Sequence, residues 1–272
     1  MKILIPTAKE LNKKATPQET LELSEKSNEI VAEFAKLSAS DLAKVYKIKE
    51  DKAMEEFSRW QDIKNNTAKS YKALDLFNGL MYRNIDRDNF NEADKEYIEK
   101  NVFITTSLYG IIGAYDLIQE HRLDFLQNVK ISGESLKNFW RASYDESIKD
   151  EESVVSLLSS EFEEVFSKNQ KEKFIKISFM EEKEGKLKVH STISKKARGK
   201  FLTELVKNKV SSKTIIGIAL IIVGIFIQSY KSEQVESFYL GFMFALICAV
   251  AWGSESVLSS YAMKNNLNEL ET

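Results

Sequence analysis

Two apolar runs near the C-terminal end constrain what this chain can fold into more than any other feature of its sequence. Residues 215–227 contain no polar side chain, and residues 238–253 contain no charged one. With their flanks they extend to about residues 214–230 and 238–258, close to the ~20 residues that a helix needs to cross a bilayer. Runs this short are also typical of buried core helices. We expect these segments to form a two-helix transmembrane hairpin within a C-terminal part, residues 211–272.

The lysines that flank the runs predict how this hairpin lies in the membrane. Lys207, Lys209 and Lys213 precede the first run, and Lys264 follows the second. Because cytoplasmic flanks carry an excess of Lys and Arg, both ends of the hairpin should face the cytoplasm. The start of the chain has no apolar stretch long enough for a secretory signal. We expect a cytoplasmic domain, residues 1–210, anchored in the inner membrane with both termini in the cytoplasm.

This first domain has the composition of a globular protein with a mixed surface. The whole chain has 39 basic and 41 acidic residues, so its net charge indicates neither a nucleic-acid nor a membrane partner, and any basic surface must be local. One cysteine and two distant histidines argue against a Cys/His zinc site. We expect neither a metal nor a cofactor.

Apolar patterning in the first domain predicts strands that alternate with helices. Strands are expected at residues 2–6, 102–106 and 153–158, and a hairpin is expected from residues 174–180 and 186–192 around Glu184-Gly185. Long helical patterns lie between the strands. The predicted fold class is therefore mixed α/β.

A helical segment, residues 27–60, is the first candidate for function. Two helices there flank a short connection, and a third follows Lys47 and Lys49. Helices joined so tightly can direct backbone N–H groups at a nucleic-acid phosphate. The alternative is a structural layer that buries Phe34 and Trp60 and leaves a solvated Lys/Glu face.

Local signals within this segment predict how its helices begin and pack. Ser38 and Asp41 have the spacing of a capping box at a helix start. Met54, Phe57 and Trp60 recur at three-residue intervals and are expected to share one buried face.

The second candidate is a basic stretch at residues 194–200. It holds Lys195, Lys196 and Arg198, and Gly199 would allow a chain or ligand to approach closely. We expect this stretch to open a helix, which places its cations at the positive end of the helix dipole. An anion such as a DNA phosphate would relieve both the dipole cost and the repulsion between the cations. The alternative is a solvated turn.

An enzymatic reading rests on residues 108–125 together with Tyr82. Asp116 or Asp124 would act as a base and Arg122 as an anion clamp. Each familiar catalytic motif lacks a member in this sequence. An ion pair between Arg122 and one of the aspartates is the structural alternative, and the sequence favours a protein that is not an enzyme.

A series of segments in the first domain resembles the YaaA family of bacterial peroxide-stress proteins. They are MKILIPTAKEL at 1–11, DLFNGLMYR at 75–83, ITTSLYGII at 104–112, HRLDF at 121–125, SLKNFW at 135–140, SLLSSEFEEVF at 156–166 and FMEEKEGKLKVHSTISKKARGK at 179–200. The resemblance implies a cytosolic protein of mixed fold with a helix-hairpin-helix element, which binds DNA and limits oxidative damage and free intracellular iron under hydrogen peroxide. The helix-hairpin-helix element maps onto residues 28–60, and the family's KKARG motif maps onto residues 195–199.

Residues 214–264 resemble a different family, the EamA-type drug/metabolite transporters. The similar stretches are residues 217–228 and 238–264. Two spans cannot line a translocation path, so the resemblance implies an anchor rather than transport. The family resembled by residues 1–210 normally continues into a closing segment, which this tail replaces.

Three functions therefore remain open on the sequence. The favoured one is a DNA-binding stress protein that holds double-stranded DNA, without strong sequence preference, through Lys195, Lys196 and Arg198 with Lys47 and Lys49. The second is an enzyme on an anionic, nucleotide-like substrate. The third is a membrane-anchored fusion of impaired function.

Overall fold

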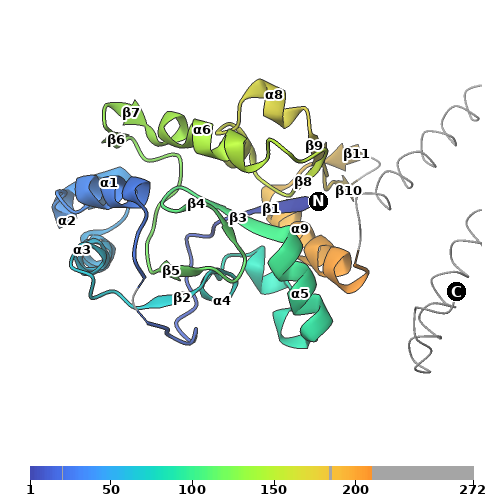
Figure 1. Ribbon diagram of the computed structural model, residues 1–272, viewed down its shortest axis with the longest axis horizontal. Coiled ribbons are helices and arrows are strands. Elements are labelled where there is room, and N and C mark those ends of the chain that lie inside the picture. Colours follow the sequence, from blue (N-terminus) through green and yellow to red (C-terminus); the bar gives the residue numbers. More distant parts are fainter. Residues whose placement is uncertain (20, 184–185, 210–272) are drawn as a thin grey trace, which may run out of the picture. The chain divides into compact units, whose positions relative to one another are not determined.

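The computed structural model describes residues 1–19, 21–183 and 186–209 (Figure 1). The chain divides into two compact units, Met1–Val210 and Ser211–Thr272, and the fold below is that of the first. None of the helices in the described ranges is long and apolar enough to cross a membrane. The predicted spans, residues 214–230 and 238–258, lie outside the described residues.

A five-stranded sheet forms the centre of the first unit. Its strand order is β4-β3-β1-β8-β9. Four strands are parallel, namely β1 (Lys2–Pro6), β3 (Val102–Thr106), β8 (Val154–Ser156) and β9 (Phe174–Lys176), whereas β4 (Gly110–Gly113) runs antiparallel to β3. Consecutive residues Ile3, Leu4 and Ile5 are all fully buried, as expected for a parallel strand covered on both faces. The strands predicted at residues 2–6 and 102–106 are confirmed, and the third is shorter than predicted.

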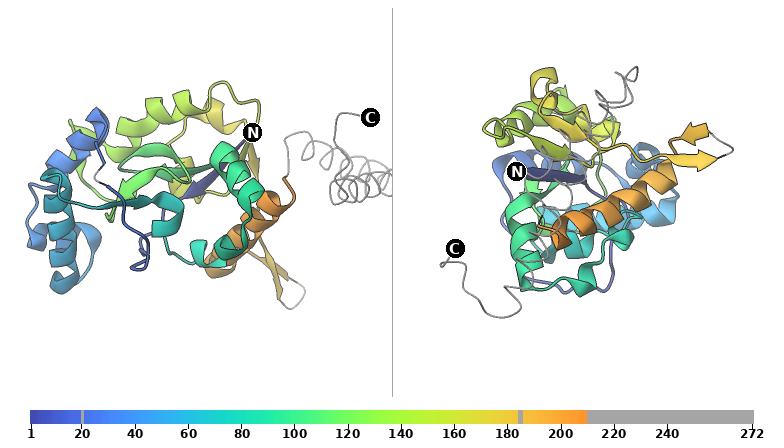
Figure 2. Two further views of the ribbon diagram at one scale, coloured as in Figure 1. Left: turned by 60° about the horizontal axis from the view of Figure 1, so that its bottom comes forward. Right: turned by 90° about the vertical axis from the view of Figure 1, so that its right-hand side faces the viewer.

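Helices cover both faces of this sheet. Helix α6 (Leu136–Ser147) lies on one side, and α5 (Glu92–Asn101) and α9 (Ser191–Lys207) lie on the other (Figures 1 and 2). From α6, Trp140 and Tyr144 donate hydrogen bonds of 2.8 Å to the carbonyl oxygens of Ser107 and Thr106. These bonds hold the segment after β3 against α6, so the mixed α/β prediction is confirmed.

Three further helices pack together at one end of the sheet. They are α1 (Glu25–Phe34), α2 (Ala39–Tyr46) and α3 (Glu50–Lys64). The predicted capping box of Ser38 and Asp41 is present at the start of α2. In their core the Trp60 ring lies 4.8 Å from the Phe34 ring, and Trp60 Nε1 donates to Tyr46 Oη at 3.0 Å.

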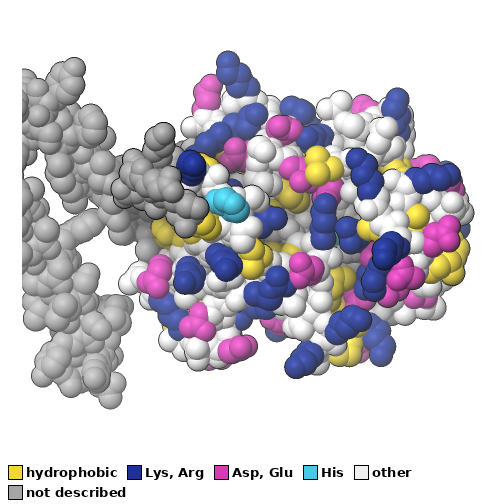
Figure 3. Space-filling view, turned by 180° about the vertical axis from the view of Figure 1, so that it is seen from behind, with side chains coloured by type: hydrophobic (Ala, Val, Ile, Leu, Met, Phe, Trp, Pro, Cys, Tyr) yellow, Lys and Arg dark blue, Asp and Glu magenta, His cyan; other side chains and the backbone are white. Residues whose placement is uncertain are grey.

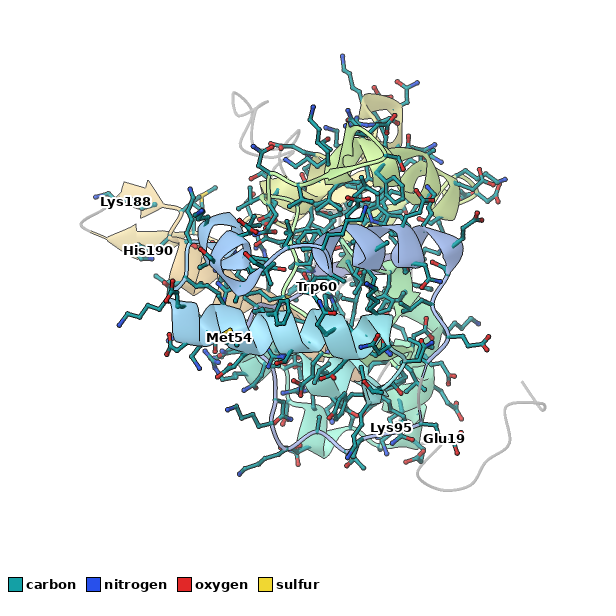
Figure 4. All side chains as sticks on the ribbon, turned by 90° about the vertical axis from the view of Figure 1, so that its left-hand side faces the viewer. Glu19, Met54, Trp60, Lys95, Lys188 and His190 are labelled. Atoms are coloured by element: carbon teal, nitrogen blue, oxygen red, sulfur yellow. The ribbon has the colours of Figure 1, made fainter. Side chains whose placement is uncertain are left out.

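One packing prediction in α3 is wrong. Trp60 is fully buried, whereas Met54 is 54% exposed on the outer side of the helix (Figure 4). Six residues along an α-helix turn through 600°, so these two side chains point about 120° apart. Only part of the predicted Met54–Phe57–Trp60 face is therefore turned to the core.

The predicted hairpin is also corrected. Phe174–Lys176 is β9, which pairs with β8 in the main sheet, and the hairpin consists of β10 (Glu181–Lys183) and β11 (Lys186–Lys188). This hairpin projects from the body of the domain (Figure 2). Alternating apolar residues predict a strand but do not specify its partner, and α9 already begins at Ser191.

Short elements complete the described fold. They are α4 (Ala73–Leu76), η1 (Tyr82–Asn84), η2 (Arg87–Asn89), α7 (Ser160–Glu163), α8 (Lys168–Lys171) and the strand pairs β2 (Ser70–Lys72) with β5 (Leu117–Gln119) and β6 (Lys130–Ile131) with β7 (Glu134–Ser135). Of these, η1 and α7 contribute to the site described next.

Candidate functional site

The topology of the sheet creates a crevice at the carboxyl ends of β1 and β8. The chain leaves β1 toward β3 on one side, and it leaves β8 toward β9 on the other. In open α/β sheets, ligands bind where connections diverge in this way. A cavity of about 470 Å³ lies here, between residues 6–10 after β1 and residues 159–162 after β8.

Five separate segments line the cavity and give it a charged wall. Besides the two segments that follow β1 and β8, these are residues 79–83 at η1, Asp124, and one face of α9. The charged lining residues are Lys9, Arg83, Lys195, Arg198, Glu10, Asp124 and Glu161. The wall therefore carries four cations and three carboxyl groups, so an anionic ligand is favoured over a cationic one.

Arg198 is the most unusual of these cations. Its side chain is half-buried, and its Nε atom is buried without a hydrogen-bond partner among the described residues. Burial lowers the pKa of the Arg198 guanidinium, and the nearby negative charge of Glu163 acts in the opposite direction. A buried donor left unpaired is costly, so an anion that bonded to Arg198 would remove a penalty that the protein otherwise retains.

Two carboxyl groups also line the cavity, one on the loop after β5 and one on α7. Asp124 is buried, its Oδ1 accepts from the Leu126 N–H at 2.9 Å, and its Oδ2 lies 2.5 Å from Lys9 Nζ. Glu161 Oε1 accepts from the Phe125 N–H at 3.0 Å. Burial, followed by the charge of Asp124, raises the pKa of Glu161. Glu161 can therefore hold a proton more readily than a surface carboxyl group would.

Tyr82 and Arg83 fix the wall rather than face a ligand freely. Tyr82 is buried, and its hydroxyl donates to the carbonyl oxygen of Pro6 at 2.9 Å. Burial raises the pKa of Tyr82 far above its usual value, so the phenol stays neutral. Arg83 forms an ion pair with Glu10 and donates to the carbonyl oxygen of Asn78 at 2.6 Å. Both residues tie η1 to the segment after β1.

The basic stretch of α9 divides between two faces of the helix. Lys195 and Arg198 line the cavity, together with Thr192 one turn earlier. Lys196 is exposed and is not part of the lining. Because α9 begins at Ser191, the cations occupy its second and third turns, and the expectation that they open the helix is wrong. The macrodipole falls off within the first turn, so its cost is smaller than predicted.

Gly199 has a structural role in placing this helix. A Cβ atom at position 199 would overlap the carbonyl oxygen of Met81 and would lie 2.9 Å from the carbonyl carbon of Asn84. The predicted close approach is therefore made by the η1 segment of the chain. It brings Lys195 and Arg198 to the cavity.

Four of the predicted site residues lie at the cavity, and the others lie elsewhere. Tyr82, Asp124, Lys195 and Arg198 are brought together. Lys47 and Lys49 are exposed in the turn between α2 and α3, where Lys47 adopts a left-handed conformation with φ 53°. Neither lines the cavity.

The two remaining residues of the enzymatic reading have other partners. Asp116 is exposed, and its Oδ2 accepts from the Gly113 N–H at 2.7 Å. The Arg122 guanidinium lies over the Tyr46 ring, 5.9 Å from its centre. The ion pair of Asp124 in the described part of the chain is with Lys9, so the predicted pairing with Arg122 is wrong for this residue.

Lys9, Arg83 and Glu161 line the cavity although the sequence predicted no site role for them. A signal for two of them was present, because Lys9 follows the first predicted strand and Glu161 follows the third. Residues just beyond the carboxyl ends of parallel strands commonly form sites. Within residues 1–19, 21–183 and 186–209, no three His, Cys, Asp or Glu side chains gather closely enough to hold a metal ion.

Charge on the surface is spread rather than concentrated. On the face shown in Figure 3, Lys and Arg side chains alternate with Asp and Glu. A nucleic acid on this face would therefore meet both signs of charge.

Comparison with known proteins places the chain in a family. A family model described as "Peroxide stress protein YaaA" matches residues 1–217. Curated relatives called "UPF0246 protein" from Streptococcus pneumoniae, among them those of strains P1031 and Hungary19A-6, are 51% identical over 212 residues, which is 78% of this chain and 88% of each relative. The resemblance of residues 214–264 to EamA-type transporters is not supported by these matches and stays a prediction. The chain belongs to the YaaA, or UPF0246, family of peroxide stress proteins.

Proposed function

We propose that this protein binds double-stranded DNA through the phosphate backbone, without strong base preference, and so helps to limit oxidative damage and free intracellular iron. The observation that carries this proposal is the cationic stretch of α9. Lys195 and Arg198 form no ion pair within the described residues, and Lys196 is exposed beside them. Unpaired cations that project from one helix suit contacts to phosphates, which position DNA but carry no sequence information.

The turn of the proposed helix-hairpin-helix element offers a second contact for DNA. Helices α2 and α3 are joined by a tight turn that holds Lys47 and Lys49, both exposed. The Lys47 N–H is hydrogen-bonded within the turn, so a phosphate there would meet mainly the lysine ammonium groups. We propose these two lysines as a secondary contact.

The dependence of affinity on salt tests the proposal. With about three phosphate contacts from α9, the slope of log K against log salt is about −2.7, and affinity falls about 40-fold between 50 and 200 mM salt. The assay is fluorescence anisotropy of a labelled 20-base-pair duplex with the full chain in mild detergent. Equal affinity at the two salt concentrations would refute the proposal.

Variants locate the contacts. Lys195→Ala with Lys196→Ala should reduce the slope by about 2. Lys149→Ala is the matched control, because Lys149 is an equally exposed lysine at the opposite, amino end of β8, paired with Glu146. If the control variant weakens binding as much as the double variant, the DNA does not contact α9.

We propose in addition that residues 214–230 and 238–258 anchor the chain in the inner membrane. The support is the apolar composition of these runs and their flanking lysines. An alkaline carbonate wash of membranes from expressing cells tests it. Retention of the intact chain is expected, and its release into the wash would refute the anchor.

A further inference from the structure

The cavity at the carboxyl ends of β1 and β8 has the size of a small-molecule site. Its volume of about 470 Å³ lies within the usual range for such sites, ~300–1,000 Å³. A DNA duplex is too wide to enter a space of this size, whereas a single nucleotide fits. Lys195 lines the cavity and is also exposed, whereas Lys196 is exposed and lies outside the lining, so one helix presents cations both to the surface and to the cavity.

The balance of charges inside the cavity predicts an anion. Lys9 is neutralised by Asp124, and Arg83 is neutralised by Glu10. Lys195 and Arg198 have no such partner among the described residues, and the Arg198 Nε is a buried donor without an acceptor. Two cations on one helix face that form no ion pair within the described residues can each contact a phosphate monoester, and charge-assisted hydrogen bonds to Arg are among the strongest in proteins.

Other lining residues supply groups for the rest of such a ligand. Asp124 and Glu161 are held in place by backbone N–H groups, and Ser159 also lines the cavity. A carboxyl pair accepts hydrogen bonds from the hydroxyl or amino groups of a sugar or base. Met81 and Phe162 add apolar surface against which a ring can pack.

We propose that this cavity binds one phosphate monoester of nucleotide size, with its phosphate at Lys195 and Arg198 and its sugar or base at Asp124 and Glu161. The inference shares these two cations with DNA binding and in that respect rests on the proposed function. The monoester has two sources with the same chemistry, a free nucleoside 5′-monophosphate and the 5′-phosphorylated end of a DNA strand.

The test is calorimetric titration of the full chain in mild detergent. The probes are the four 2′-deoxynucleoside 5′-monophosphates, inorganic phosphate, and the unphosphorylated deoxynucleosides. At least one monophosphate should bind about tenfold more tightly than inorganic phosphate or its own nucleoside, because only it has both a phosphate for Lys195 and Arg198 and a sugar and base for Asp124 and Glu161. If no monophosphate exceeds inorganic phosphate, the inference is overturned.

Two variants of neighbouring lysines connect the binding to the cavity. Lys195→Ala should weaken the monophosphate about tenfold, the loss of one charge-assisted contact. Lys196→Ala should leave monophosphate affinity unchanged, since Lys196 is an equally exposed neighbour outside the lining. Equal effects of the two substitutions would overturn the cavity as the binding place. Both lysines are exposed, so neither substitution disturbs the core.

Competition with duplex DNA separates this inference from the proposed function. Displacement of the bound monophosphate by a 5′-phosphorylated duplex and not by a 5′-hydroxyl duplex supports the strand end as the source. Displacement by neither supports the free nucleotide as the source and means that the duplex does not contact Lys195 and Arg198, which refutes that part of the proposed function. Equal displacement by both is expected if the duplex backbone contacts these two cations, and it excludes the strand end as the source. Monophosphate binding without any duplex binding would refute the proposed function alone.

Discussion

Because its side chain is buried, His121 should cause the free energy of unfolding to fall steeply as the pH is lowered below neutrality. Its side chain is 2% exposed, and its Nδ1 atom lies 2.8 Å from the carbonyl oxygen of Gln119. The imidazole packs edge-on against Tyr109 and Phe77. Burial lowers the pKa of His121 from 6.5 to about 4, partly opposed by the hydrogen bond to Gln119. The folded protein therefore holds this imidazole neutral.

The sign of the effect follows from where the proton binds. Between pH 6.5 and pH 4 the unfolded chain protonates His121 and the folded chain does not, so the free energy of unfolding rises with pH in this window and falls as the pH is lowered. With the two pKa values above, the loss between pH 7 and pH 5 is about 2 kcal/mol, and the slope near pH 5 is about 1.2 kcal/mol per pH unit. Against a typical stability of about 5–15 kcal/mol, this loss is measurable.

Urea unfolding of the full chain between pH 5 and pH 8 measures this slope. His121→Gln retains a side-chain donor but does not titrate, so the difference in stability between wild type and variant should shrink by about 2 kcal/mol from pH 7 to pH 5. Glu56 is buried and Glu161 is half-buried, burial raises the pKa of both carboxyl groups, and their opposite contribution is common to both proteins. His190→Gln is the control, because His190 is exposed between the last strand of the projecting hairpin and the start of α9 (Figure 4). Parallel pH profiles for wild type and His121→Gln would refute the reasoning.

Two further substitutions test the elements that position the site. Gly199→Ala places a Cβ atom against the carbonyl oxygen of Met81, so α9 must shift. We expect the free energy of unfolding in urea to fall by about 1–3 kcal/mol and anion binding to weaken. If both quantities were unchanged, the close packing of Gly199 would be contradicted. Ser38→Ala removes the side-chain acceptor for the Asp41 N–H at 3.1 Å. It should lower the free energy of unfolding by about 1 kcal/mol without changing DNA affinity. A decrease below about 0.3 kcal/mol in the same urea assay would contradict the role of this cap.

Local sequence signals predicted the elements whose cause is itself local. The capping box at Ser38 needs only residues within one turn, and the three central residues of the strand at residues 2–6 are all apolar because both faces of the sheet are covered. The face of α3 was predicted less well. A three-residue repeat drifts around a helix of 3.6 residues per turn, and only the packing of α1 and α2 shows that Trp60 rather than Met54 faces inward.

The site depends on contacts that no local signal contains. Lys9, Asp124 and Glu161 come from three distant segments, and they meet only because β8 pairs with β1. Because β3 and β8 lie on the two sides of β1, the chain crosses from one side of β1 to the other between them. The apolar pattern of a single strand does not predict the order of strands in the sheet. Asp124 was predicted as a candidate without its partner, and Arg122, adjacent in sequence, was predicted to act with it although it faces Tyr46.

The basic stretch of α9 shows how one sequence pattern serves two surfaces. Adjacent residues on an α-helix point 100° apart, so Lys195 faces the cavity while Lys196 faces solvent. The packing of Gly199 against η1 sets this rotation, because no other residue type allows the helix backbone to come so close to Met81. Consequently, a change at Gly199 or at Lys195 should affect a cavity ligand and a surface ligand together, whereas a change at Lys196 should affect the surface ligand alone.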